Sequence, residues 1–194
     1  MSKGRLEAFS DGVIAIIITI MVLELKVPHE ATLAALIPVF PVFVSYILSF
    51  VILGIYWNNH HHLLQAIKNV DGRVLWANLH LLFWLSLIPF VTGWVGQNHF
   101  AAWPVALYGV VQSFAAVAYF ILTQALIFLH GRDSALATAI GRDFKGKAST
   151  VVFFVAVPIA FLNSWFAFML YVLVAIIWLV PDRRIEKTLA ERGT

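Results

Sequence analysis

The sequence predicts an all-α membrane protein with six transmembrane helices per subunit, and three observations support this fold class. Hydrophobic residues make up 61% of the 194 residues and charged residues 12%, against roughly 45–50% and about 25% in soluble proteins. A spanning helix needs about 20 mostly apolar residues, and the chain offers six apolar stretches near that length. Lysine and arginine gather in alternate connections between these stretches. We expect residues 1–194 to form a single membrane domain.

Each predicted helix begins and ends where polar residues interrupt an apolar stretch. The first has Ser10-Asp11 near its start, the second ends at Tyr56-Trp57, and the last two are separated only by Asn163-Ser164. The polar segment 131–147 reads as a loop, and residues 182–194 as a short charged helical tail. We place the six helices at residues 8–26, 32–56, 74–96, 102–129, 147–162 and 164–180.

The distribution of positive charge predicts the orientation of these helices. If both termini are cytoplasmic, the inside segments hold every lysine and arginine except Lys26, which lies in an outside loop. Such a bias is what the positive-inside rule describes, and a count of five or seven helices would destroy it. The inside residues are Lys3, Arg5, Lys68, Arg73, Arg132, Arg142, Lys145, Lys147, Arg183, Arg184, Lys187 and Arg192.

The first helix is apolar along almost its whole length but has ionisable groups at its start. Arg5, Ser10 and Asp11 precede the run Val13–Leu25. Ionisable groups at membrane depth are costly and usually face a protein interior or a water-filled path. They therefore mark this helix as a candidate functional element.

One stripe of the first helix is a candidate pore lining. Ile16, Thr19 and Leu23 stand at i, i+3 and i+7, and Gly12 extends the stripe by one turn. Aliphatic rings can close a pore by dewetting, and a threonine hydroxyl would offer the ion a side-chain oxygen. The same stripe also fits a lipid-facing helix, and spacing alone does not choose between the two.

Polar residues near the same membrane surface predict a network that holds the first three helices in register. Asp11 can accept hydrogen bonds, while Arg5, a histidine of the second helix and Asn78 can donate them. Trp57 and the run His60-His61-His62 end the second helix. Which of the three histidines approaches Asp11 stays open, because successive residues point about 100° apart on a helix.

Several other classes of function find little support in the sequence. The chain has no cysteine, which excludes thiolate metal sites and cysteine nucleophiles. Three adjacent histidines diverge and lack the i, i+4 spacing of zinc ligands. The net charge of +3 lies beside apolar segments, without the basic groove that binds nucleic acid. We therefore expect no metal, no cofactor, no nucleic-acid partner and no enzymatic activity.

Parts of the first three helices resemble a known family. Arg5-x-x-x-Phe9-Ser10-Asp11 with the stripe that follows resembles the first helix of the prokaryotic relatives of the lysosomal potassium channel, transmembrane protein 175. Tyr56-Trp57-x-x-His60 and Asn78…Ser86-x-x-Pro89 are similar to the second and third helices of that family. The later helices match only as apolar spans.

This resemblance implies a tetramer of six-helix subunits around a central pore lined by the first helix of each. It implies potassium conduction without the usual carbonyl filter, in a prokaryotic plasma membrane. Ile16 and Leu23 would form constrictions, and Thr19 a layer of hydroxyls between them. The anchoring set would be Arg5, Phe9, Ser10, Asp11, Trp57, a histidine such as His60, and Asn78.

The leading functional hypothesis is therefore a homotetrameric, potassium-permeable cation channel that is gated at a hydrophobic neck on the first helix. The alternative is a proton-coupled secondary transporter that uses Asp11 and the histidines of the second helix as protonation sites. Against the transporter stands the absence of matching broken helices in two halves of the chain.

Overall fold

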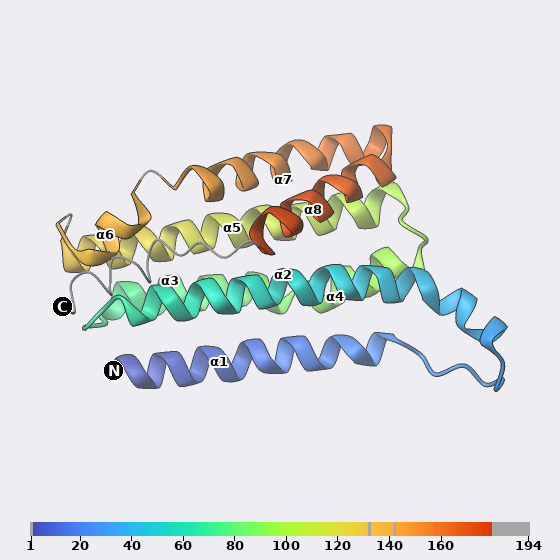
Figure 1. Ribbon diagram of the computed structural model, residues 1–194, viewed down its shortest axis with the longest axis horizontal. Coiled ribbons are helices and arrows are strands. Elements are labelled where there is room, and N and C mark those ends of the chain that lie inside the picture. Colours follow the sequence, from blue (N-terminus) through green and yellow to red (C-terminus); the bar gives the residue numbers. More distant parts are fainter. Residues whose placement is uncertain (1, 132, 142, 180–194) are drawn as a thin grey trace.

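The computed structural model describes residues 2–131, 133–141 and 143–179, and all regular structure in these ranges is helical (Figure 1). The predicted tail 182–194, together with Arg132 and Arg142, lies outside the described residues. The elements in chain order are α1 (Lys3–Ile20), η1 (Met21–Glu24), η2 (Leu33–Val39), α2 (Phe40–Gln65), α3 (Gly72–Ser86), α4 (Ile88–Gln97), α5 (Ala102–His130), α6 (Ala135–Ile140), α7 (Phe144–Leu162) and α8 (Ser164–Leu179).

The helical stretches correspond closely to the six predicted ones. Five of them are long and apolar enough to cross a bilayer, namely Lys3–Glu24, Leu33–Gln65, Gly72–Gln97, Ala102–His130 and Phe144–Leu162. The sixth, α8, has 16 residues and spans about 24 Å, whereas the hydrocarbon core of a bilayer is about 30 Å thick. The count of six spans therefore stays a prediction.

Several boundaries differ from the sequence prediction: α1 begins at Lys3 rather than residue 8, and α6 and the start of α7 lie in the predicted loop 131–147. Three further differences have a local reason. α2 continues to Gln65 instead of ending at residue 56, because polar residues end an apolar run without ending a helix. α3 begins at Gly72, where the Asp71 side chain caps it by accepting a hydrogen bond from the Val74 N–H at 2.9 Å. The third predicted helix is interrupted at Leu87 between α3 and α4, since Pro89 lacks the N–H that would continue the ladder.

The six helical stretches are each antiparallel to the next one in the sequence, with α3 and α4 forming one stretch (Figure 1). α5 packs against α3, α4, α7 and α8. α1 lies at one edge and packs mainly against α2 and α3 (Figure 1). The start of α1, the α2–α3 connection and α6 share one end of the molecule (Figure 1). Lys3 and Lys68 therefore lie at the same end, as the charge pattern predicts.

Candidate functional site

Helix α1 has two faces of different character. Its buried face holds Leu6, Ser10, Ile14 and Ile17, and Met21 continues it in η1. The opposite face is uncovered in the single chain, with Ile16 60% and Leu23 76% exposed. Gly12 and Thr19 are exposed as well. All members of the predicted stripe thus lie on the face that no other part of the described chain covers.

Leu23 follows the stripe although it lies beyond the end of α1. It belongs to the 3₁₀ turn η1, in which each residue turns about 120° rather than 100°. Four steps of about 100° lead from Ile16 to Ile20, and three steps of about 120° lead from Ile20 to Leu23. Around the helix axis, the Leu23 side chain therefore points about 40° away from that of Ile16. The change of helix type therefore leaves Ile16 and Leu23 on the same side.

The Thr19 hydroxyl is oriented by its own helix. Its Oγ1 lies 3.0 Å from the carbonyl oxygens of both Ala15 and Ile16. Because the hydroxyl hydrogen is donated inward to these carbonyls, the lone pairs of Oγ1 remain on the exposed side. Thr19 therefore presents a hydrogen-bond acceptor between two large aliphatic side chains.

Behind α1, a buried chain of hydrogen bonds links the first three transmembrane stretches. His60 Nε2 and Asn78 Oδ1 are 2.7 Å apart, Asn78 Nδ2 donates to Ser10 Oγ at 2.9 Å, and Ser10 donates to the Leu6 carbonyl at 2.8 Å. All three side chains are at most 1% exposed. Since the Asn78 amide donates to Ser10, its oxygen faces His60, and His60 Nε2 carries the hydrogen.

A second set of contacts joins α1 to α2 closer to the surface. Trp57 Nε1 donates to Asp11 Oδ1 at 3.0 Å, and His61 Nδ1 lies 3.2 Å from Glu7 Oε1. The Trp57 and His61 rings stack with centroids 6.1 Å apart. Glu7 and Asp11 are four residues apart on α1, and their partners His61 and Trp57 are four residues apart on α2. The two contacts therefore lie one helical turn from each other.

The structure thus resolves the predicted anchoring set into parts. Asp11 is held by Trp57, whereas His60 pairs with Asn78. Arg5 and Phe9 lie on the exposed side of α1, Phe9 being 51% exposed. Neither side chain joins the network within the described chain.

Sequence reasoning missed two sets of polar residues. The first is the pair Glu7 and His61, which the i, i+4 spacing with Asp11 and Trp57 would have revealed. The second is a buried relay in which Tyr108 donates to Ser49 at 3.0 Å, Ser49 to Thr92 at 2.7 Å, and Thr92 to the Ile88 carbonyl at 2.6 Å. Ser45 and Ser49 stand at i, i+4 on α2, and Ser45 also donates to the Thr92 carbonyl at 3.1 Å, so this spacing could have signalled a polar face. The relay ties α2, α4 and α5 together.

Comparison with known proteins assigns the chain to a family. A family model described as "Endosomal/lysosomal potassium channel TMEM175" matches residues 5–89. A protein named a potassium channel from Chryseobacterium sp. (strain P1-3) is 55% identical over 191 residues, covering 98% of this chain and all of the relative. The chain belongs to the TMEM175 family.

The fold leads to the same family. A crystal structure of a TMEM175 homologue from Chamaesiphon minutus, described as a lysosomal potassium-selective channel homologue, matches with a TM-score of 0.80 and 25% identity. The match covers 93% of this chain and 97% of the other. A zebrafish (Danio rerio) relative, named an endosomal/lysosomal proton channel TMEM175, is 30% identical over 141 residues, which is 67% of this chain and 25% of that protein.

These relatives confirm the family resemblance, the all-helical membrane fold and the expectation of a non-enzymatic protein, since each is named a channel. The segment matched by the TMEM175 family model contains α2, α3 and all of α1 except its first two residues. The polar network and the exposed stripe therefore lie mostly in the part of the chain that carries the family signature.

Replacing Trp57 by phenylalanine is expected to weaken the attachment of α1 to α2 without removing the stacked ring. The lost hydrogen bond has a carboxylate acceptor, but Trp57 is 44% exposed. We therefore expect a loss of about 1 kcal/mol. The free energy of unfolding in detergent measures this effect. Trp76→Phe is the matched control, because Trp76 is 75% exposed, and an equal loss in both variants would contradict the role of the Asp11 contact.

Proposed function

We propose that this TMEM175 protein is a potassium-permeable cation channel in which four copies surround a central pore lined by α1. The observation that carries the proposal is the uncovered stripe of α1 opposite its buried face. The potassium-channel names of the bacterial relatives supply the ion.

In such a tetramer, Ile16 and Leu23 would form two aliphatic rings with the Thr19 hydroxyls between them. Along the helix axis Thr19 lies about 4.5 Å from Ile16 and, because Leu23 is in the 3₁₀ turn η1, about 7.5 Å from Leu23. An ion passing the constriction formed by Ile16 and Leu23 would lose part of its water shell there. The Thr19 hydroxyl oxygens could then coordinate the ion through their exposed lone pairs. The rings would close the pore when they approach closely enough to exclude water.

The regular geometry of α1 argues against a carbonyl filter in this pore. From Lys3 to Ile20 the chain is one continuous α-helix, so most of its backbone carbonyls accept hydrogen bonds within the helix. Oxygen ligands on the exposed face would therefore come from side chains. Thr19 is the only hydroxyl on that face between Gly12 and Leu23.

The positive charges support an orientation with both termini in the cytoplasm of a prokaryotic cell and the channel in its plasma membrane. The lysines at the starting end of α1 and in the α2–α3 connection share one end of the molecule (Figure 1). The named bacterial relatives fit this location.

The direct test is potassium flux from liposomes reconstituted with the purified protein. We expect rapid potassium efflux that needs no proton gradient, from particles whose mass is that of a tetramer. Absence of flux from verified tetramers would contradict the proposal. Active particles with fewer than four copies would contradict the pore architecture but leave channel activity standing.

Thr19→Val is expected to change the ratio of potassium to sodium permeability, because it replaces the hydroxyl with a methyl group of nearly equal size. The reversal potential under potassium and sodium gradients measures that ratio. Thr19→Ser keeps the hydroxyl and is the matched control. If Val and Ser shift the ratio equally, the hydroxyl has no part in selectivity.

Proton permeation is a second candidate, favoured by the proton-channel names of vertebrate relatives such as the zebrafish protein. Asp11 and His61 lie near the start of the proposed pathway and can exchange protons. A pH-sensitive dye inside the same liposomes distinguishes the possibilities. Proton flux without potassium supports a proton channel, whereas potassium flux that strictly requires a proton gradient supports the coupled transporter.

A further inference from the structure

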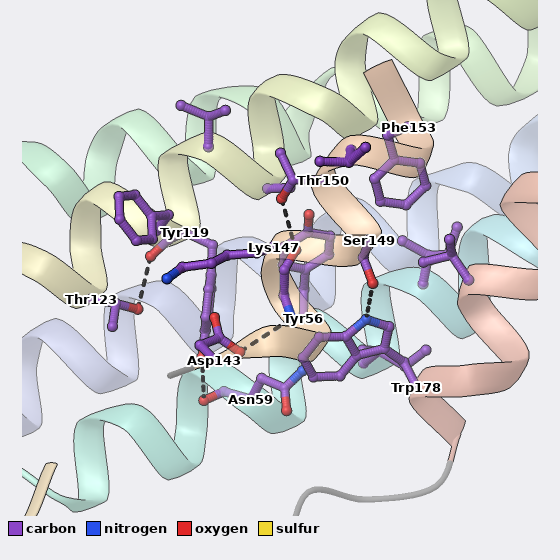
Figure 2. Close-up of a pocket in the computed structure, with 18 of the residues that line it drawn as sticks. Tyr56, Asn59, Tyr119, Thr123, Asp143, Lys147, Ser149, Thr150, Phe153 and Trp178 are labelled. Carbon is purple, nitrogen blue, oxygen red and sulfur yellow. Dashed lines mark hydrogen bonds between the residues drawn. The ribbon is translucent and has the colours of Figure 1, made fainter. Parts of the chain in front are cut away.

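A cavity lies between α2, α5, α7 and α8, on the other side of α2 from α1 (Figure 2). Its volume is about 490 Å³, within the range of roughly 300–1,000 Å³ typical of small-molecule sites. On the same turn of α2, Trp57 and His60 contact α1 and α3, whereas Tyr56 and Asn59 line the cavity. The cavity is thus separate from the proposed pore.

The shape and walls of the cavity suit a hydrocarbon chain. Its lining follows α7 from Gly146 to Val155, a length of about 14 Å at the rise of an α-helix. Over this length the walls are mostly apolar, and the apolar side chains include Ile52, Phe120, Phe153 and Phe154. A compact polar ligand would leave most of this surface without suitable contacts.

The cavity also has polar groups, supplied by α2 and by the first turns of α7. The Tyr56 hydroxyl, the Asn59 amide and the Lys147 ammonium have no hydrogen-bond partner among the described residues. All three are labelled in Figure 2. The lining carboxylate, Asp143, accepts from the Gly146 N–H at 3.2 Å and so caps α7. Lys147 therefore supplies a cation that no carboxylate of the described chain pairs with.

Charge complementarity selects the ligand class. A phosphate group is the acceptor that an ammonium such as that of Lys147 pairs with most strongly. A second cation lies close by, since Lys145 Nζ is 4.5 Å from the centroid of the Trp178 ring and Trp178 lines the cavity. Under the proposed orientation this end faces the cytoplasmic leaflet, where anionic lipids reside.

We propose that this cavity binds one acyl chain of an anionic phospholipid, with the phosphate of the lipid paired to Lys147, while Asn59 and Tyr56 line the cavity apart from it. The chain lies along α7 between α2 and α5. The binding site does not depend on ion conduction, so a failure of the channel proposal would leave it intact.

Native mass spectrometry of the full-length protein in detergent tests the site. The probes are a palmitoyl-oleoyl phosphatidylglycerol, a phosphatidylcholine with the same chains, and palmitate. Lys147→Gln changes only an exposed side chain and is the decisive variant. Lys68→Gln is its matched control, because Lys68 is also exposed and lies in the α2–α3 connection at the same end of the molecule. Val117→Trp, which fills the cavity from α5, is the second variant.

We expect the wild-type protein to bind phosphatidylglycerol about fivefold more tightly than phosphatidylcholine. Both lipids carry a phosphate, but the choline cation neutralises the headgroup of phosphatidylcholine, and one lysine near a net anionic headgroup contributes about that factor. Lys147→Gln should abolish this preference and Lys68→Gln should keep it. Val117→Trp, if it assembles normally, should lose both phospholipids. Equal binding of the two phospholipids by the wild type, an unchanged preference in Lys147→Gln, or retention of palmitate in place of phospholipid would each overturn the proposal.

Discussion

Leu23→Ala is expected to raise potassium flux through reconstituted channels at least about tenfold. Leu23 is 76% exposed on the free face of α1, and in a tetramer four copies would meet at one level of the pore. Truncation removes most of each aliphatic side chain, which widens the neck and allows water to fill it. A tenfold increase corresponds to lowering the barrier by about 1.4 kcal/mol, less than the transfer free energy of two buried methylene groups.

The measurement is potassium efflux from liposomes at equal protein density, together with the permeability ratio of potassium to sodium. Ile16→Asn should also raise potassium efflux, because an amide in place of the aliphatic side chain allows water to occupy the level of the pore that Ile16 lines. Leu162→Ala is the matched control, since Leu162 is 88% exposed at the end of α7, away from α1. Unchanged flux in both pore variants, with tetramers intact, would place the gate elsewhere.

Among the proposed variants, Asn78→Ala is expected to lower the free energy of unfolding the most, by about 3 kcal/mol. Asn78 is fully buried and bridges His60 and Ser10. Its truncation removes two hydrogen bonds and leaves the His60 N–H and the Ser10 oxygen buried without that partner, and each such group costs about 1–3 kcal/mol. Thermal unfolding in detergent should shift down by about 6–12 °C for a domain of this size.

Two comparisons make the Asn78 result specific. Asn69→Ala removes an exposed asparagine from the α2–α3 connection and should shift the transition little. A double-mutant cycle with Ser10→Ala should show coupling of at least about 0.5 kcal/mol, because the two residues share one hydrogen bond. Additive losses would mean that the hydrogen bond between α1 and α3 does not stabilise the protein.

The contacts of α1 connect these two predictions. Its buried face carries Ser10, and its exposed face carries the proposed pore lining. A variant that loosens the buried face is therefore expected to change conduction only after it changes assembly. A variant on the exposed face should change conduction while assembly stays normal, and that difference separates the anchoring role from the permeation role.

The sequence by itself determined the membrane class, the approximate position of each apolar helix, the charge asymmetry and the family resemblance. These features depend on composition and on the length of apolar runs, which the bilayer selects directly. The sequence also singled out Ser10, Asp11, Trp57, His60 and Asn78 as a polar set at one membrane surface.

Only the tertiary structure decided which members of that set meet. His60 pairs with Asn78 and Trp57 with Asp11, while His61 meets Glu7. A helix that is apolar on all sides carries no pattern that specifies its rotation, and a rotation of 100° exchanges one histidine for the next. The Ser49–Thr92–Tyr108 relay and the cavity beside Lys147 needed the structure for the same reason. Both arise from faces of three or more helices, whose mutual rotation is set by packing.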